Sequence, residues 1–255
     1  FSPVGSDGNR FTGSFDGNGF IISNLTILRA DNSQNFNSQE DEFDVGLFGS
    51  TDNATLEKIK ITSSKVQGFE NVGGIVGVMN GGVLIDSSFN IGTSDNSCVS
   101  GHCVWARYGY GGGGLVGKAV GATISNSQTA GPVKGSGNTI GGLVGLLDEN
   151  STIEDSTSAS NVDGGYSIGG AVGESQGTII NVSASGYIDA NLVENYKDGM
   201  KAGGLVGFMA GGSITDSFAT GNVHADYSRV GGLVGEMDSG NIASSYATGD
   251  VEAVG

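Results

Sequence analysis

Apolar residues recur along the chain in short clusters flanked by glycine, and not in the long stripes that mark amphipathic helices. The clusters follow the pattern Gly-Gly-Leu-Val-Gly, with close copies from Gly113, Gly141, Gly203 and Gly231 and looser ones from Val45, Gly73 and Gly169. Counted from the second position, the gaps between them are 28, 40, 28, 28, 34 and 28 residues. The chain is therefore a repeat array with a unit of 28 residues and two insertions.

An aliphatic column lies about ten residues behind each glycine tract. It reads Ile22, Leu56, Ile85, Ile124, Ile153, Ile179, Ile214 and Ile242, which predicts eight coils. A serine usually follows three residues later and a valine or isoleucine nine residues later. These offsets share one parity, as do side chains on one face of a β-strand.

The pattern predicts an all-β right-handed parallel β-helix, or β-solenoid, with three short strands in each coil. A unit of 28 residues is too short for a four-stranded propeller blade, and the chain lacks the apolar period of a helical solenoid. The hand follows the usual rule for parallel crossovers. Eight coils at the strand spacing give a rod roughly 40 Å long.

A bend is expected between the aliphatic and serine columns, because the side-chain parity changes there. The residues at this bend are Asn24, Lys58, Asp86, Asn126, Asp155, Asn181, Asp216 and Ser244. Asn and Asp suit bends because their side chains bond nearby backbone groups. The main interpretation is a structural ladder, and the alternative is a row of cation sites in which Asp86, Asp155 and Asp216 would be weak calcium candidates.

The valine of each tract is adjacent to a leucine, so one of the two would normally point outward from a strand. We expect glycine to bend the chain so that both are buried. The alternative is an exposed valine stripe that would contact a neighbouring domain or molecule.

Residues 1–255 are interpreted as one solenoid domain, excerpted from a larger protein. Residues 1–45 form an atypical first coil with an acidic loop over 31–44, and residues 46–255 form regular coils with insertions near 93–112 and 189–201. All three irregular segments are predicted to leave one edge of the repeat. Insertions along one face of a solenoid often form its binding face. The alternative, given equal weight, is that these loops lengthened without acquiring a binding role.

The first insertion carries the chain's two cysteines and its single tryptophan. We expect Cys98 and Cys103 to form a local disulfide in an oxidising, exported setting, with two free thiols as the alternative. A zinc site using His102 fits no standard ligand spacing. The candidate ligand-binding residues on the two insertions are Trp105, Arg107, Tyr108, Tyr110 and Tyr196, since aromatic rings stack on sugars and protein surfaces.

The net charge of −16, with 11 basic residues scattered along the chain, argues against nucleic acid or an anionic membrane surface as partners. The chain also lacks an apolar run of the ~20 residues that a membrane helix needs. These features predict an extracellular location, at a cell surface or in secreted form. Calcium remains the cofactor alternative, and no other cofactor is expected.

Known catalytic motifs are missing from the sequence. It has no H-E-x-x-H, no G-x-S-x-G, and no glycine pattern of a P-loop or dinucleotide site. We therefore expect no catalytic residues, no resident metal and no enzyme activity. Paired carboxylates are common enough to keep a sugar-cleaving site as an alternative.

The tract followed by I-x-x-S-x-A-x-G-x-V, as in residues 203–223 and 231–251, resembles the GLUG-motif repeat of bacterial surface and secreted proteins. The resemblance implies a solenoid and is not specific for function, since the motif occurs in large adhesins and in non-catalytic parts of immunoglobulin A proteases. The expected function is a non-enzymatic adhesin segment that acts as a rigid stalk, or binds a glycan or a surface protein of a host or partner cell through its loops. The alternatives are a β-helical polysaccharide-active enzyme and an accessory domain of a secreted protease. Other domains of the same chain are expected as neighbours.

Overall fold

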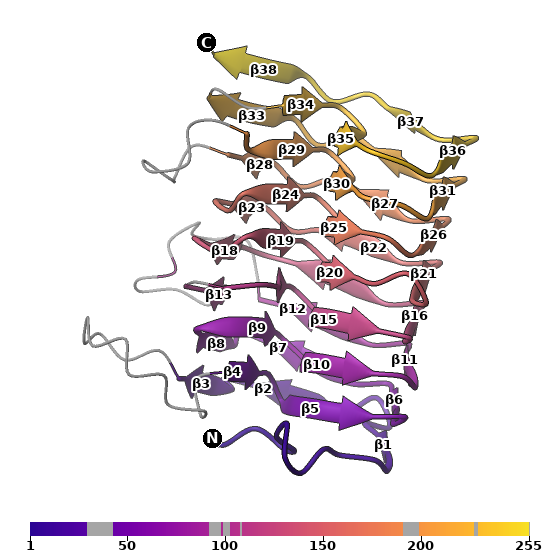
Figure 1. The fold of residues 1–255 in the computed structure, drawn as a ribbon. Coiled ribbons are helices and arrows are strands. Elements are labelled where there is room, and N and C mark those ends of the chain that lie inside the picture. The colour runs from indigo at the N-terminus through magenta and orange to yellow at the C-terminus, as the bar shows by residue number, and fades with distance from the viewer. Residues whose placement is uncertain are drawn as a thin grey trace.

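The computed structural model describes residues 1–29, 43–91, 98, 103–107, 109–190, 199–226 and 229–254. Every regular element in these ranges is a β-strand, and the strands stack in successive coils from the N-terminus to the C-terminus (Figure 1). The architecture is the predicted right-handed parallel β-helix.

Five parallel sheets, numbered I to V in the order in which each coil visits them, run the length of the described solenoid. Sheet I contains β1 (Ser14–Asp16), β6 (Thr55–Glu57), β11 (Val83–Ile85), β16 (Thr123–Ser125), β21 (Thr152–Glu154), β26 (Thr178–Ile180), β31 (Ser213–Thr215) and β36 (Asn241–Ala243). Sheet II contains β2 (Ile21–Ser23), β7 (Lys60–Thr62), β12 (Ser88–Asn90), β17 (Gln128–Ala130), β22 (Thr157–Ala159), β27 (Ser183–Ala184), β32 (Phe218–Ala219) and β37 (Tyr246–Ala247). Sheet III contains β3 (Thr26–Leu28), β8 (Lys65–Gly68), β13 (Val104–Ala106), β18 (Val133–Gly135), β23 (Val162–Asp163), β28 (Ile188–Asp189), β33 (Val223–Asp226) and β38 (Val251–Val254).

The glycine tracts join the remaining two sheets, which lie side by side in Figure 1. Sheet IV contains β4 (Phe43–Val45), β9 (Glu70–Gly73), β14 (Gly112–Gly113), β19 (Thr139–Gly141), β24 (Ser167–Gly169), β29 (Lys201–Gly203) and β34 (Arg229–Gly231). Sheet V contains β5 (Phe48–Asp52), β10 (Val76–Asn80), β15 (Val116–Val120), β20 (Val144–Leu147), β25 (Val172–Ser175), β30 (Val206–Met209) and β35 (Val234–Met237). The prediction of three strands per coil is therefore wrong, because the bends at each tract and at the Asn/Asp column divide the coil into five.

Like residues lie above like residues, as the repeat predicts. Ile124, Ile153, Ile179 and Ile214 are register partners in sheet I, and each is fully buried. Two members of the predicted column, Ile85 and Ile22, are wrong. In the third coil Leu84 occupies the column and pairs with Ile124. In the first coil Phe15 occupies it, and Ile22 lies instead in sheet II, where it pairs with Ile61.

The Asn/Asp column forms a left-handed corner between sheets I and II, where φ lies between 47° and 53° in every coil after the first. Asn and Asp tolerate this conformation better than most residues. Asn24, which was assigned to the same column, lies at the next corner, between sheets II and III, and its N–H bonds the carbonyl of Thr62. Asn181 donates from Nδ2 to Oδ1 of Asp155 at 2.6 Å, which supports the ladder interpretation for that pair.

Buried serines next to this corner form a ladder between coils. The hydroxyl of Ser127 donates to the carbonyl of Ser125 at 2.8 Å and accepts the N–H of Ser87 at 3.2 Å. In turn, the N–H of Ser127 donates to the hydroxyl of Ser156 at 3.1 Å. In this ladder the buried hydroxyl of Ser127 is therefore satisfied both as a donor and as an acceptor. The prediction placed Ser88 in this column, but the residue that bonds Ser127 is Ser87.

The glycines of each tract lie where neighbouring coils touch backbone to backbone. A Cβ on Gly169 would lie 1.9 Å from the carbonyl oxygen of Val172 and 2.8 Å from the nitrogen of Gly207 in the next coil. A Cβ on Gly170 would lie 2.1 Å from the carbonyl oxygen of Gly204 and 2.9 Å from the Ala184 side chain across the core. Only glycine fits these positions, so the tract is a requirement of the fold.

The valine column is buried, as expected. Val76, Val116, Val144, Val172 and Val206 have no exposed surface, and the isoleucine, leucine or alanine before each is buried as well. Val234, in the last tract, is partly buried. The sharp bend between sheets IV and V therefore turns both apolar side chains of each tract into the core.

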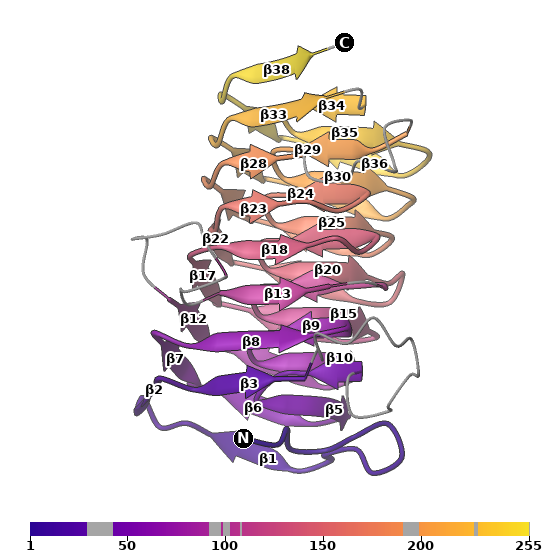
Figure 2. The ribbon, with the colours of Figure 1, turned by 90° about the vertical axis from the view of Figure 1, so that its left-hand side faces the viewer.

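The prediction that all three irregular segments leave one edge is wrong. The described strands on either side of 30–42 are β3 and β4, and those on either side of 191–198 are β28 and β29, so both connections run from sheet III to sheet IV. The described strands on either side of 92–102 are instead β12 of sheet II and β13 of sheet III, both labelled in Figure 2. The error arose because 104–106, taken as part of the insertion, forms a regular strand that pairs with β8 and β18.

The serine ladder is interrupted at Val182, which gives a test of its contribution. In Val182→Thr, the new hydroxyl replaces a methyl group at the point where it can accept the N–H of Ser156. We expect little change in the free energy of unfolding, whereas Val172→Thr in the valine column should cost about 1–3 kcal/mol because its hydroxyl is buried without a partner. Urea unfolding of both variants checks this, and equal losses would contradict the ladder.

The glycine requirement predicts that Gly169→Ala lowers the melting temperature sharply, because its Cβ would collide with backbone on two sides. Overpacking of this kind costs typically 1–3 kcal/mol or more. Gly8→Ala is the matched control, since a Cβ there meets nothing within 4 Å. Thermal unfolding followed by circular dichroism measures both, and a tolerated Gly169→Ala would show that the tract is not sterically constrained.

Candidate functional site

A group of aromatic and charged side chains lies on the outer surface where sheets IV and V meet. This hollow, called the IV–V groove below, has a volume of about 480 Å³. It is lined by Tyr110, Asn138, Tyr166, Ser167, Glu174, Lys201 and Phe208. Its volume is within the usual range of ligand-binding pockets.

The first wall of the groove comes from the residues at and just before the strands of sheet IV. Ser167 and Lys201 are register partners on β24 and β29, and Tyr166 immediately precedes β24. Tyr110 and Asn138 hold the equivalent places in the third and fourth coils, because Gly112 pairs with Ile140 and Ile140 with Ile168. Consecutive coils thus place tyrosine, asparagine and tyrosine along one edge.

The second wall comes from the residue that follows each glycine tract by one position. These residues are Val78, Lys118, Leu146, Glu174, Phe208 and Glu236, which are register partners along the outer face of sheet V. They differ from coil to coil while the flanking tract is nearly constant. The sequence interpretation missed Glu174, Phe208 and Tyr166, and this variation in an otherwise regular repeat was the available signal.

The ammonium group of Lys201 bridges the two walls. Its Nζ lies 3.6 Å from the ring centroid of Phe208 and 5.2 Å from that of Tyr166, so it interacts with the faces of both rings. It also lies 3.4 Å from a carboxylate oxygen of Glu236, which Arg229 contacts at 3.0 Å. The positive charge of Lys201 is therefore already matched within the protein.

Glu174 is half-buried beside these groups, and its partial burial raises its pKa above the ordinary glutamate value. The positive charge of Lys201 opposes the shift, but desolvation is the larger effect. The groove therefore combines three aromatic rings with a carboxyl group that gains a proton more readily than a solvated one.

Of the predicted ligand-binding residues that the structure describes, which are Trp105, Arg107 and Tyr110, only Tyr110 lines the groove, with 56% of its surface exposed. Trp105 lies on the outer face of sheet III between Gln67 and Lys134, and the Arg107 guanidinium lies 5.4 Å from its ring centroid. Tyr108, Tyr196 and His102 lie outside the described residues.

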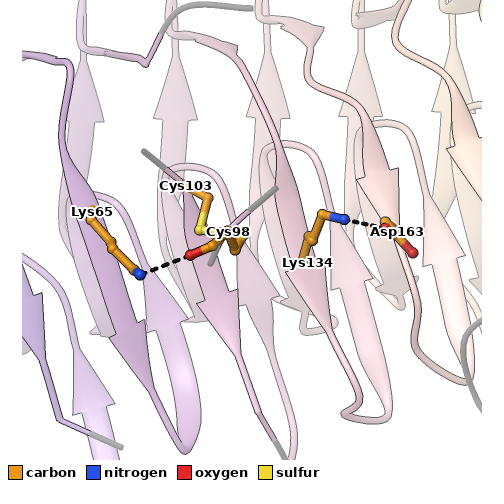
Figure 3. The surroundings of a disulfide bond; sticks show 5 residues. All are labelled: Lys65, Cys98, Cys103, Lys134 and Asp163. Atoms are coloured by element: carbon orange, nitrogen blue, oxygen red, sulfur yellow. Dashed lines mark hydrogen bonds and ion pairs between the residues drawn. A yellow bond between two sulfur atoms is a disulfide. The ribbon is translucent and has the colours of Figure 1, made fainter. Parts of the chain in front are cut away.

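The predicted disulfide is present and joins Cys98 to Cys103, with their Cα atoms 5.6 Å apart (Figure 3). Both cysteines are buried. The ammonium of Lys65 donates to the carbonyl oxygen of Cys98 at 2.7 Å. On a neighbouring part of sheet III, Lys134 forms an ion pair with Asp163. The disulfide thus fastens residue 98 to the start of β13.

Within the described ranges, no three His, Cys, Asp or Glu side chains come close enough to hold a metal ion together. The calcium candidates Asp86, Asp155 and Asp216 lie at the I–II corner in alternate coils, with Asn126 and Asn181 at the corners between them. Calcium binding therefore stays an untested prediction. Among the described residues, no helix is long and apolar enough to cross a membrane.

Comparison with known proteins finds a matching repeat motif, a related sequence and solved structures of similar fold. The family described as the GLUG motif matches residues 198–223 and 226–252. Halomucin of Haloquadratum walsbyi is 31% identical over 188 residues, which cover 71% of this chain and 2% of halomucin. The chain therefore spans a small fraction of that relative. The solved structure of an IgA1 protease matches with a TM-score of 0.60 and 17% identity, over 96% of this chain and 20% of that one.

The expectation of no enzyme activity is contradicted by this last match, because a protease contains the same fold over 96% of the length of this chain. At 17% identity the likeness establishes the fold and transfers no catalytic residue.

The raised pKa of Glu174 predicts a pH-dependent effect on stability. Its folded-state pKa lies above the unfolded value, so ionisation disfavours the folded state at neutral pH, and the penalty disappears as pH falls through the folded pKa. Glu174→Gln should therefore raise the melting temperature at pH 7 and have little effect below the ordinary glutamate pKa.

Glu236→Gln is the matched control for this measurement, because Glu236 is paired with Lys201 and Arg229. It should lower the melting temperature at pH 7. Scanning calorimetry across the pH range compares the two variants, and destabilisation by Glu174→Gln at neutral pH would contradict the assigned burial effect.

Proposed function

We propose that this GLUG-repeat β-solenoid is an extracellular segment of a large surface adhesin, in which it acts as a rigid stalk. The observation that carries the proposal is the continuous in-register pairing of successive coils in all five sheets. Each coil is fastened to the next by backbone hydrogen bonds, so the rod resists bending and its length increases with coil number.

The extracellular location has two supports. The Cys98–Cys103 disulfide suits an oxidising compartment. The relative halomucin carries the name of a mucin and is very large, since the matched residues cover 2% of it. A protein of such size has a use for segments that hold other domains apart, and adhesion would then depend on the domains so presented.

The stalk proposal is tested by duplicating two regular coils. A second copy of residues 118–173 preserves the register, because Lys118, Leu146 and Glu174 occupy the same place in successive coils. We expect the maximum dimension from small-angle X-ray scattering to grow by about 10 Å, with no change in cross-section. As a control, the duplicated copy of Gly142 is changed to Val, which should prevent stacking. A duplication that enlarges the cross-section and leaves the length unchanged would reject the stalk.

The disulfide gives a second prediction. Because it closes a very short loop, its removal in Cys98→Ala/Cys103→Ala should cost about 2 kcal/mol or less of unfolding free energy. Reductant should lower the free energy of unfolding of the unaltered chain by a similar amount, which will appear as a lower melting temperature. It should leave the melting temperature of the double variant unchanged. Thiol labelling of protein taken directly from its native cells should find both cysteines oxidised, and free thiols there would contradict an extracellular site.

A further inference from the structure

We propose that the IV–V groove binds a neutral polysaccharide chain that lies along the solenoid axis. The inference goes beyond the stalk role and is independent of it. It rests on the tyrosines along one edge of the groove and on the ion pair between Lys201 and Glu236. It rests also on the flanking strands, whose backbone groups are already paired within their sheets.

The aromatic edge has a spacing that suits a polymer. Tyr110 and Tyr166 hold equivalent positions two coils apart, with Asn138 between them. Two strand spacings amount to about 10 Å. An extended glycan advances a comparable distance over two sugar rings, so alternate sugars would meet a tyrosine and the sugar between them would meet an amide.

The opposite wall supplies complementary groups. Phe208 and Glu174 are neighbours on sheet V and face the tyrosine edge across the hollow. Aromatic rings bind the apolar faces of sugars, and carboxyl, amide and hydroxyl groups bond the sugar hydroxyls. The Lys201 ammonium lies over the Phe208 ring at 3.6 Å and farther from the Tyr166 ring, at 5.2 Å. Tyr110, with 56% of its surface exposed, is the most accessible stacking surface of the three.

The charges favour a neutral chain over an ionic one. The groove's cation, Lys201, is paired with Glu236, so an anionic glycan would have to compete with an internal carboxylate. The whole chain carries a net charge of −16, which repels anionic polymers further. Among the described lining residues, a cationic glycan would meet a single carboxyl group, that of Glu174, beside the positive charge of Lys201.

An extended peptide fits the groove less well than a glycan. The strands that flank the groove, β19, β24, β20 and β25, are each paired on both sides within their sheets. Their backbone groups therefore offer no edge to which a peptide could add as a strand. Sugar hydroxyls need only the side chains that line the hollow.

The test measures binding of the whole chain to neutral hexasaccharides by titration calorimetry. The panel contains β-1,4-linked glucose, mannose and xylose and α-1,4-linked glucose, with hexagalacturonate and hexameric chitosan as anionic and cationic probes. We expect at least one neutral oligosaccharide to bind, and the charged probes to bind more weakly.

Tyr110→Ala and Tyr166→Ala should each weaken that binding on the order of tenfold, the loss expected for one aromatic contact. Tyr246→Ala is the matched control, since Tyr246 is 55% exposed, as Tyr110 is 56% exposed, and lies on sheet II away from the groove. It should leave the affinity unchanged.

Three results would overturn the proposal: no binding by any neutral member of the panel, a preference for a charged probe, or equal effects of Tyr110→Ala and Tyr246→Ala. Thermal unfolding of each variant confirms that it is folded before its binding is interpreted. Because scattering tests the stalk and calorimetry tests the groove, failure of either proposal is recognised separately.

Discussion

The structure depends on the direct contact between the backbones of neighbouring coils at the glycine tracts. The N–H of Leu143 bonds the carbonyl oxygen of Ala171 in the next coil at 2.8 Å, and the equivalent bond recurs from Leu115, Ala171 and Leu205. A side chain at the flanking glycines would force the coils apart. The high glycine content, which usually destabilises regular structure, is here the condition for stacking.

This contact also explains the composition of the core. Sheet II faces the tracts across a thin interior, where Phe89 in the third coil is replaced by Thr129, Ser158, Ala184 and Ala219 in later coils. Polar residues are accepted there because their hydroxyls find backbone partners, as Thr129 does with the carbonyl of Gly142 at 2.9 Å. The core therefore combines aliphatic columns from sheets I, III, IV and V with a small, partly hydrogen-bonded column from sheet II.

The fold class, the coil count and the buried valine column were predictable because the same residue spacing recurs in every coil. Prediction failed where the local sequence offered two aliphatic neighbours, as at Leu84 and Ile85, since the spacing does not decide which one faces inward. It also failed for strand number, because the left-handed corners divide the coil more finely than the apolar pattern reveals. The groove was missed because Tyr166 and Phe208 lie on different walls, and only the bend between sheets IV and V brings them together.

Hydrogen exchange measured residue by residue by NMR tests the central claim most directly. The amides of Leu115, Leu143, Ala171 and Leu205 bond the adjacent coil, so we expect them to exchange only through global unfolding and to be among the most protected in the chain. The exposed turn amide of Asn9 should exchange much faster. Tract amides that exchange as fast as Asn9 would show that the coils are not held together at the glycine tracts.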